Sequence, residues 1–275
     1  MSGGFTIGGI EMRTSTLLGT VAAALCLALS VPAFAQDAGD ERKPLSDVWL
    51  MVPKAGMEMQ FEESLKTHMA MRASQGDPRE WKVYVPVMGN DMDVYQFRSC
   101  CHEFADQDRY VAFTTDKGFS DHWNETVHQY VASYEHYMER NDWQHSHMPQ
   151  DADPAKYYGV TAWKLKEGAG MASENARKKM SMIALENGWG EQSDWLWLTR
   201  IGGKPMLMVV SPYADFADMA PPETSFFEFV AEHVGSEEKA EKMFKKFGSG
   251  MAASTFTVWT ERSDLSMPTT AQGDD

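Results

Sequence analysis

Cysteine is scarce in this chain, with 3 among 275 residues. Cys26 lies in an apolar N-terminal stretch, and Cys100 and Cys101 are adjacent. Neighbouring strand residues point to opposite faces, and a disulfide between them would close a strained ring, so we expect no bond between this pair. The sequence therefore excludes a small domain held together by disulfides.

Basic residues are also in short supply. Lysine and arginine number 25 against 40 aspartates and glutamates, which gives a formal net charge of −15. An acidic surface repels phosphate backbones and anionic lipids, so we expect neither nucleic acid nor a membrane surface as a partner. The chain also lacks a Gly-rich phosphate loop and the Gly-x-Ser-x-Gly, His-Glu-x-x-His and Cys-x-x-Cys motifs, so the sequence requires no cofactor.

Long apolar runs are absent apart from a leader-like segment. Residues 12–35 carry a basic start, a short apolar stretch and a closing Ala-Phe-Ala, as export signals do. The stretch is too short for a membrane-spanning helix, and Leu25 precedes Cys26 where a lipoprotein signal needs a small residue. We predict a signal peptide over 1–35 with its start at Met12, and an exported protein, periplasmic or secreted, without a membrane anchor.

The chain repeats its motifs in the same order. Trp81, a glycine turn and Phe104-Ala-Asp are echoed by Trp195, a pair of glycines and Phe216-Ala-Asp. The offsets between matching motifs stay between 111 and 122 residues. Such an ordered series at near-constant spacing indicates a duplicated domain of about 100 residues.

Hydrophobic periodicity predicts the order strand, helix, strand, strand, helix, strand in each copy. Residues 134–138 could continue the preceding helix, but their counterpart at 255–260 is β-branched and aromatic, so we predict a strand. The elements predicted in the first copy are strands 48–52, 81–87, 92–101 and 134–138 and helices 57–72 and 119–131. Those predicted in the second copy are strands 160–165, 194–201, 205–211 and 255–260 and helices 172–187 and 237–247.

The second copy carries an insertion at 221–234 that is rich in phenylalanine and predicts a short extra helix. If Phe226, Phe227 and Phe229 are exposed, they would form an interaction surface for a partner protein. The predicted organisation is a signal peptide over 1–35, a flexible lead-in over 36–46, a first repeat over 47–149, a linker over 150–156, a second repeat over 157–268 and a tail over 269–275.

The repeated element order is that of ferredoxin-like domains, and the chain resembles the dimeric α/β-barrel superfamily. The motifs that carry the resemblance are the tandem Trp strand, glycine turn, apolar strand and Phe-Ala-Asp, plus the closing residues 264–268. The resemblance implies an α+β fold in which two tandem ferredoxin-like (βαββαβ) repeats pack sheet to sheet as an intramolecular dimeric α/β barrel. It leaves function open, because the superfamily includes cofactor-free oxygenases, haem enzymes, isomerases and proteins of no known activity. One chain could complete such a barrel, and a higher oligomer is not excluded.

Reactive side chains concentrate in the first copy, which holds seven of the 8 histidines. On the strand at 92–101, alternation places a polar set on one face, and the apolar set on the other suits burial under the helices. We therefore expect the polar set to line the barrel cavity, opposite an apolar wall that includes Met206 and Met208. The sequence predicts a central cavity for a small apolar or aromatic molecule. The predicted ligand-binding residues are Arg98, His102, Tyr84, Gln96 and Cys100.

Two readings of these residues stay open. Arg98 and His102 could instead lie at the solvent end of the strand, paired with Glu103 or Asp106. A cofactor-free monooxygenase or isomerase, in the manner of superfamily relatives, would need His102 or His136 as a proton shuttle. His136 shares a strand face with a tyrosine, and the sequence alone does not orient that face.

A third reading is copper or zinc binding through the histidine-rich first copy. His145 and His147 would point the same way in extended chain, and Met148 or Cys100 could add a soft ligand for copper. A His-x-His loop of this kind is more often solvated, so no metal is predicted from it.

Overall fold

The computed structural model describes residues 42–150, 155–168 and 170–268. The predicted signal peptide and tail and most of the predicted lead-in lie outside these residues. Within the described ranges, no helix is both long and apolar enough to cross a membrane.

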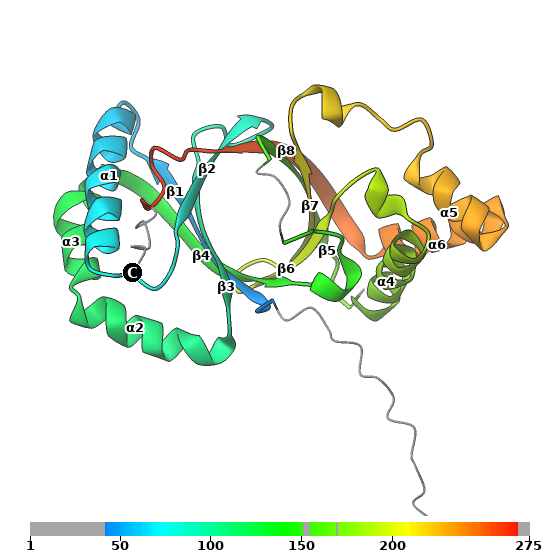
Figure 1. Ribbon diagram of the computed structural model, residues 1–275, viewed down its shortest axis with the longest axis horizontal. Coiled ribbons are helices and arrows are strands. Elements are labelled where there is room, and N and C mark those ends of the chain that lie inside the picture. Colours follow the sequence, from blue (N-terminus) through cyan, green and yellow to red (C-terminus); the bar gives the residue numbers. More distant parts are fainter. Residues whose placement is uncertain (1–41, 151–154, 169, 269–275) are drawn as a thin grey trace, which may run out of the picture. The chain divides into compact units, whose positions relative to one another are not determined.

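Eight antiparallel strands close into a barrel in the order β1-β3-β2-β8-β5-β7-β6-β4, and Figure 1 looks down its axis. In each half, the spatial order is fourth, first, third, second strand, which is the ferredoxin-like arrangement. The α+β barrel is thus the architecture that the resemblance implied, and the duplication of the sequence stays a prediction. The strands are β1 (Leu45–Pro53), β2 (Lys82–Met88), β3 (Tyr95–His102), β4 (Val131–Asn141), β5 (Tyr157–Leu165), β6 (Leu196–Ile201), β7 (Met206–Tyr213) and β8 (Met251–Glu261).

The two halves join edge to edge at two seams. One seam pairs β2 with β8, where Tyr84 lies opposite Glu261. The other pairs β4 with β6, where Glu139 lies opposite Arg200. Because both edges of each half are hydrogen-bonded, this closed sheet has no free edge.

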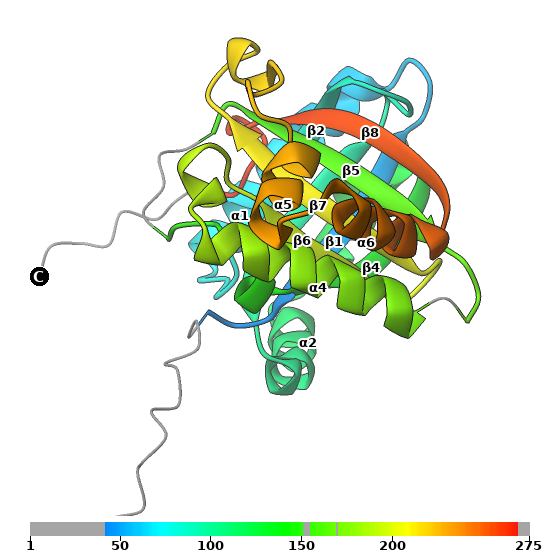
Figure 2. The same ribbon diagram turned by 90° about the vertical axis from the view of Figure 1, so that its right-hand side faces the viewer.

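Six helices flank the barrel in the described part of the chain. Figure 1 shows α1, α2 and α3 outside the first half and the others outside the second, and Figure 2 shows α4, α5 and α6 lying across the strands of the second half. They are α1 (Glu58–Ser74), α2 (Gln107–Asp116), α3 (Phe119–Thr126), α4 (Gly170–Glu186), α5 (Phe226–Val234) and α6 (Glu237–Ser249).

Helix α1 was predicted from the spacing of its apolar residues, and the structure shows the physical reason for that spacing. Phe61, Leu65 and Met69 recur every four residues and so share one face of the helix. All three are buried in the first-half core, which also contains Val83 and Phe97 from the sheet. Burial of one such side chain stabilises the fold by roughly 1.5–3 kcal/mol.

The segment after β3 differs from the prediction. Helix α2 was not expected, because it buries no residue and Val111 is 61% exposed, so it has no apolar stripe to reveal it. The predicted helix at 119–131 ends earlier, at Thr126, and β4 begins at Val131. The choice of a strand for 134–138 is confirmed.

The insertion forms the predicted short helix α5. The Ser225 side chain caps it by accepting a hydrogen bond from the Glu228 backbone N–H. In turn, the Glu228 carboxylate accepts one from the Ser225 backbone N–H. Phe229 is buried, and the rings of Phe226 and Phe227 pack against Phe244 of α6 at 5.9 and 5.4 Å. The proposed interaction surface is therefore wrong: these rings belong to the second-half core.

Candidate functional site

The sheet of the first half separates two cavities. One is the barrel lumen, with a volume of about 420 Å³. The other, here called the outer cavity, lies between the outward face of the same sheet and helices α1, α2 and α3, and has a volume of about 550 Å³. Both fall in the range of roughly 300–1,000 Å³ that is usual for small-molecule pockets.

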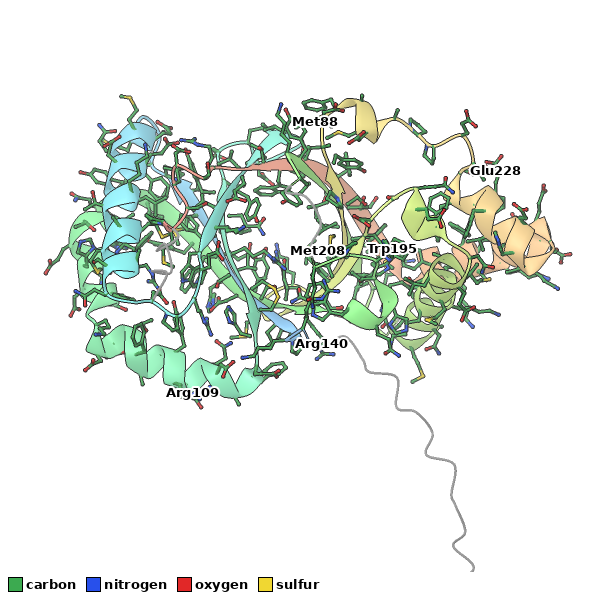
Figure 3. All side chains as sticks on the ribbon, in the orientation of Figure 1. Met88, Arg109, Arg140, Trp195, Met208 and Glu228 are labelled. Carbon is green, nitrogen blue, oxygen red and sulfur yellow. A yellow bond between two sulfur atoms is a disulfide. The ribbon has the colours of Figure 1, made fainter. Side chains whose placement is uncertain are left out.

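The lumen has one polar and one apolar wall. Tyr84, Gln96 and Arg98 face it from the first half, and Met206 and Met208 face it from the second. Figure 3 labels Met208 on the barrel wall. Burial raises the pKa of Tyr84, so its phenol stays protonated. The structure thus places three of the predicted ligand-binding residues at the lumen, and their role stays a prediction.

Arg98 is engaged by the protein itself. Its Nε donates to Glu139 at 3.2 Å, and its Nη2 donates to Ser46 at 2.7 Å and to Asn141 at 3.2 Å. The alternative pairing with Glu103 or Asp106 is therefore not what the structure shows. Because the guanidinium is satisfied internally, it does not by itself require a ligand.

His102 does not share the face of Arg98. In the pairing of β3 with β1, Ser46 lies opposite Cys100 and Leu45 lies opposite His102, so β3 carries one extra residue. This bulge reverses the alternation, and His102 lies buried on the helix side, within 3.0 Å of Ser99 Oγ. The prediction that His102 lines the lumen is wrong for that reason.

The extra residue is Cys101, and the structure joins it to Cys100 by a disulfide. The argument against this bond assumed regular strand alternation, which the bulge interrupts. Cys100 keeps the lumen side, where Asn141 Nδ2 lies 3.6 Å from its sulfur. The expectation of two unbonded cysteines is therefore corrected.

The outer cavity contains the second histidine candidate, His136. On β4 it projects to the helix side of the sheet, where its Nε2 donates to Asp47 Oδ1 at 2.8 Å. Its ring stacks on Trp49 with centroids 4.0 Å apart. Although helices cover this face of the sheet, the His136 side chain is 41% exposed. The His136 ring is therefore accessible to a molecule in the cavity.

The Asp47 carboxylate accepts hydrogen bonds from two side chains, Arg79 and His136. Arg79 Nη1 lies 2.6 Å from Asp47 Oδ2, and both side chains are over nine-tenths buried. The guanidinium also donates to Gln107 Oε1 at 2.9 Å and lies 3.6 Å above the Tyr110 ring. Because the Asp47 carboxylate accepts from His136 Nε2, it fixes the His136 tautomer with its proton on that nitrogen.

The remaining wall of the outer cavity is mostly aromatic and apolar. A second polar group lies at its far side, where His68 contacts His122 through the two Nδ1 atoms at 3.0 Å. Burial, followed by the charge of Arg72 and by His122, lowers the pKa of His68 to about 3. The aromatic and sulfur-containing side chains that line the cavity are Trp49, Trp81, Trp123, Phe97, Phe119, Tyr110, Tyr134, Met51, Met69 and Met138.

Sequence reasoning missed most of this cavity. Asp47 and Arg79 come from segments 32 residues apart, and Gln107 belongs to a helix without a periodic pattern. One signal was available: Asp47 is a lone carboxylate inside the otherwise apolar strand β1, and a buried charge needs a partner.

His145 and His147 do not converge. A 3₁₀ turn over Trp143–His145 breaks the extended chain, so the alternation that would align them does not apply. His145 Nδ1 pairs with Asp142 at 2.9 Å, and His147 Nδ1 pairs with Asp194 at 2.7 Å. Among residues 42–150, 155–168 and 170–268, no group of three or more His, Cys, Asp or Glu residues is arranged to hold a metal ion.

Fold and cavities together define an α+β barrel protein with two cavities of the size that small molecules occupy. No family model matches the chain. No curated protein matches its sequence.

Solved structures are similar at the level of the backbone. A monooxygenase-like protein from Lactobacillus acidophilus has 9% identity and a TM-score of 0.47, over 82% of this chain and 95% of that one. An anthrone oxidase-like protein has 11% identity and a TM-score of 0.48, over 81% and 95%. A mutant chlorite dismutase from Candidatus Nitrospira defluvii in complex with cyanide has 9% identity and a TM-score of 0.46, over 82% and 93%.

Proposed function

We propose that the protein binds a small, largely apolar aromatic molecule in the outer cavity. The observation that carries this proposal is the accessible, aromatic lining on a sheet face that helices should otherwise bury. Aromatic side chains favour planar ligands through offset stacking and edge contacts. His136 and Asp47 supply the polar group that would orient such a ligand.

The sequence predicts a binding site in the lumen, and the proposed site lies instead on the other face of the same sheet. The chemical class of ligand, apolar or aromatic, is unchanged. The outer cavity is the larger of the two, and it holds a histidine whose side chain is partly exposed. In the lumen, the guanidinium of Arg98 is already paired with Glu139 and Ser46.

Calorimetric titration with 1-naphthol tests this site. Thr114 lines the outer cavity, and its neighbour Thr115 is exposed on the same helix, so Thr114→Trp and Thr115→Trp form a matched pair. We expect Thr114→Trp to abolish binding by filling the cavity and Thr115→Trp to bind as the wild type does. Equal affinity in the two variants would overturn the assignment of the site.

The second candidate function is proton transfer, the alternative expected of a cofactor-free oxygenase or isomerase. The hydrogen bond from Nε2 to Asp47 leaves the Nδ1 lone pair of His136 as a proton acceptor. The acceptor would take a proton from a carbon or hydroxyl of the ligand, which leaves a stabilised anion. Return of the proton to another carbon would make the reaction an isomerisation, and addition of O₂ to the anion would make it an oxygenation.

Exchange of the α-protons of 2-tetralone for deuterium, followed by NMR, measures proton removal without assuming the later step. We expect His136→Gln, which can still contact Asp47, to lower the exchange rate by roughly 10²-fold or more. His233→Gln is the matched control, because that exposed histidine belongs to the other half. Absence of catalysed exchange in the wild type would refute proton transfer and leave the binding proposal standing.

We also propose export as the location of this activity. The support is the predicted signal peptide over 1–35, with its basic start, short apolar stretch and closing Ala-Phe-Ala. Fusion of residues 12–40 to a reporter enzyme that is active only outside the cytoplasm would test the prediction, and an inactive reporter would contradict it.

A further inference from the structure

The lumen has features that the proposed function does not use. Its second-half wall is an apolar cluster, in which Leu196, Leu198 and Met208 are buried together. Trp143 and Met148 pack against this cluster and also line the lumen. Because both follow the end of β4, they lie at the end of the lumen opposite to the β2–β3 hairpin.

Arg200 lies on the same strand as Leu196 and Leu198 and also lines the lumen. One of its hydrogen-bond donors, Nε, is unsatisfied among the described residues. The side chain is 8% exposed, and its Nη1 donates to Glu135 at 2.6 Å. The guanidinium lies 3.6 Å above the ring of Tyr137. Its Nε is buried and has no hydrogen-bond partner in the described part of the chain. A buried donor without a partner costs stability, so this nitrogen marks a place for an acceptor.

Both arginines that line the lumen are already paired. Arg98 is paired with Glu139, and Arg200 is paired with Glu135. Asp91, in the β2–β3 hairpin, adds one further exposed negative charge to the lining. An anionic ligand would therefore add negative charge to a lining whose arginines are already paired, which is unfavourable. A neutral acceptor, such as a carbonyl oxygen, meets the need of Arg200 without that cost.

We propose that the lumen is a second binding site, for a neutral, mostly apolar molecule with a carbonyl group. The carbonyl oxygen accepts a hydrogen bond from Arg200 Nε, and the apolar body packs on Leu198, Met206 and Met208. The first-half sheet separates this site from the outer cavity, so the proposal does not depend on the proposed function.

The test uses 2-acetonaphthone, with 2-isopropylnaphthalene as the probe that lacks the acceptor and 2-naphthoate as the anionic probe. Titrations are made on Thr114→Trp, in which the outer cavity is filled, so that the lumen alone is measured. We expect the ketone to bind this protein. We also expect it to bind roughly tenfold more tightly than either of the other two probes.

Two variants, each made in the Thr114→Trp protein, localise the ketone to the lumen. Arg200→Lys keeps the charge that pairs with Glu135 but removes Nε, so we expect a roughly tenfold loss for the ketone and no change for the hydrocarbon. Ala162→Trp fills the lumen and should abolish binding of both, and Ser254→Trp, on an exposed position of β8, is its control. If Ala162→Trp does not fold, Arg200→Lys decides alone.

Three results would overturn the proposal. They are tighter binding of 2-naphthoate than of the ketone, loss of ketone binding in Thr114→Trp, and equal ketone affinity in Thr114→Trp with and without Arg200→Lys. The second result would place the ketone in the outer cavity and so support the proposed function while removing this one.

Discussion

His68 gives the fold a predictable sensitivity to acid. The side chain is 2% exposed, and burial, then the Arg72 charge and His122, lower its pKa from 6.5 to about 3. The folded protein therefore holds His68 neutral over a range of pH in which the unfolded chain binds a proton there. In the folded state, protonation would place two positive charges together on helix α1.

The sign and size of the effect follow from this difference. Above pH 6.5, neither state binds the proton and His68 has no effect. Below pH 6.5, the unfolded state gains a proton that the folded state does not bind. The free energy of unfolding therefore decreases as the pH is lowered from 6.5 to about 3. Between pH 7 and pH 5, the loss from His68 is about 2 kcal/mol.

Urea unfolding of the wild type and His68→Gln at pH 7 and pH 5 measures this quantity. Other groups titrate in the same range, so the useful number is the difference between the two proteins in their pH-dependent loss. We expect His68→Gln to lose about 2 kcal/mol less than the wild type over this interval, with an unchanged m-value. His233→Gln, with an exposed histidine, should lose as much as the wild type. The same loss in His68→Gln and the wild type would refute the reasoning.

Three further changes should be visible in urea unfolding. Arg79→Met leaves the buried Asp47 carboxylate without its guanidinium and should cost about 3–5 kcal/mol, and a cost below about 1 kcal/mol would contradict the buried ion pair. Gly190→Ala places a Cβ 2.6 Å from the His147 ring and should cost about 1–3 kcal/mol, which His147→Ala in the same chain should partly recover. Ser225→Ala removes the N-cap of α5 and should lower the free energy of unfolding by about 1 kcal/mol. An unchanged free energy of unfolding would show that this cap does not stabilise the helix.

Elements with a buried stripe could be predicted from the sequence, and elements without one could not. Helix α1 shows three buried residues at regular spacing, and β4 was recognised from the composition of its counterpart in the second half. Helix α2 has no fully buried residue, and it is held to the rest of the fold by Gln107 and Tyr110, whose polar contacts hydrophobic periodicity does not record.

The site was harder to predict than the fold, for two physical reasons. A bulge of one residue at Cys101 moved His102 to the other face of β3, and no composition or spacing reveals such a bulge. The orientation of β4, which decides whether His136 or Tyr137 faces the lumen, depends on packing against α3 and on pairing with β1. Arg98 lies at the lumen because its half of β3 keeps the regular alternation, and its role in binding stays a prediction.

The pairing of β8 has a consequence for how the protein assembles. This last strand of the described chain joins β5 of its own half to β2 of the other, and Val85 and Thr260 meet across that seam from positions far apart in the sequence. Such distant pairing forms slowly, and until it forms, β2 and β5 expose free backbone donors and acceptors. A chain cut before Met251 would leave both edges open, so it should associate with other copies rather than persist as a smaller barrel.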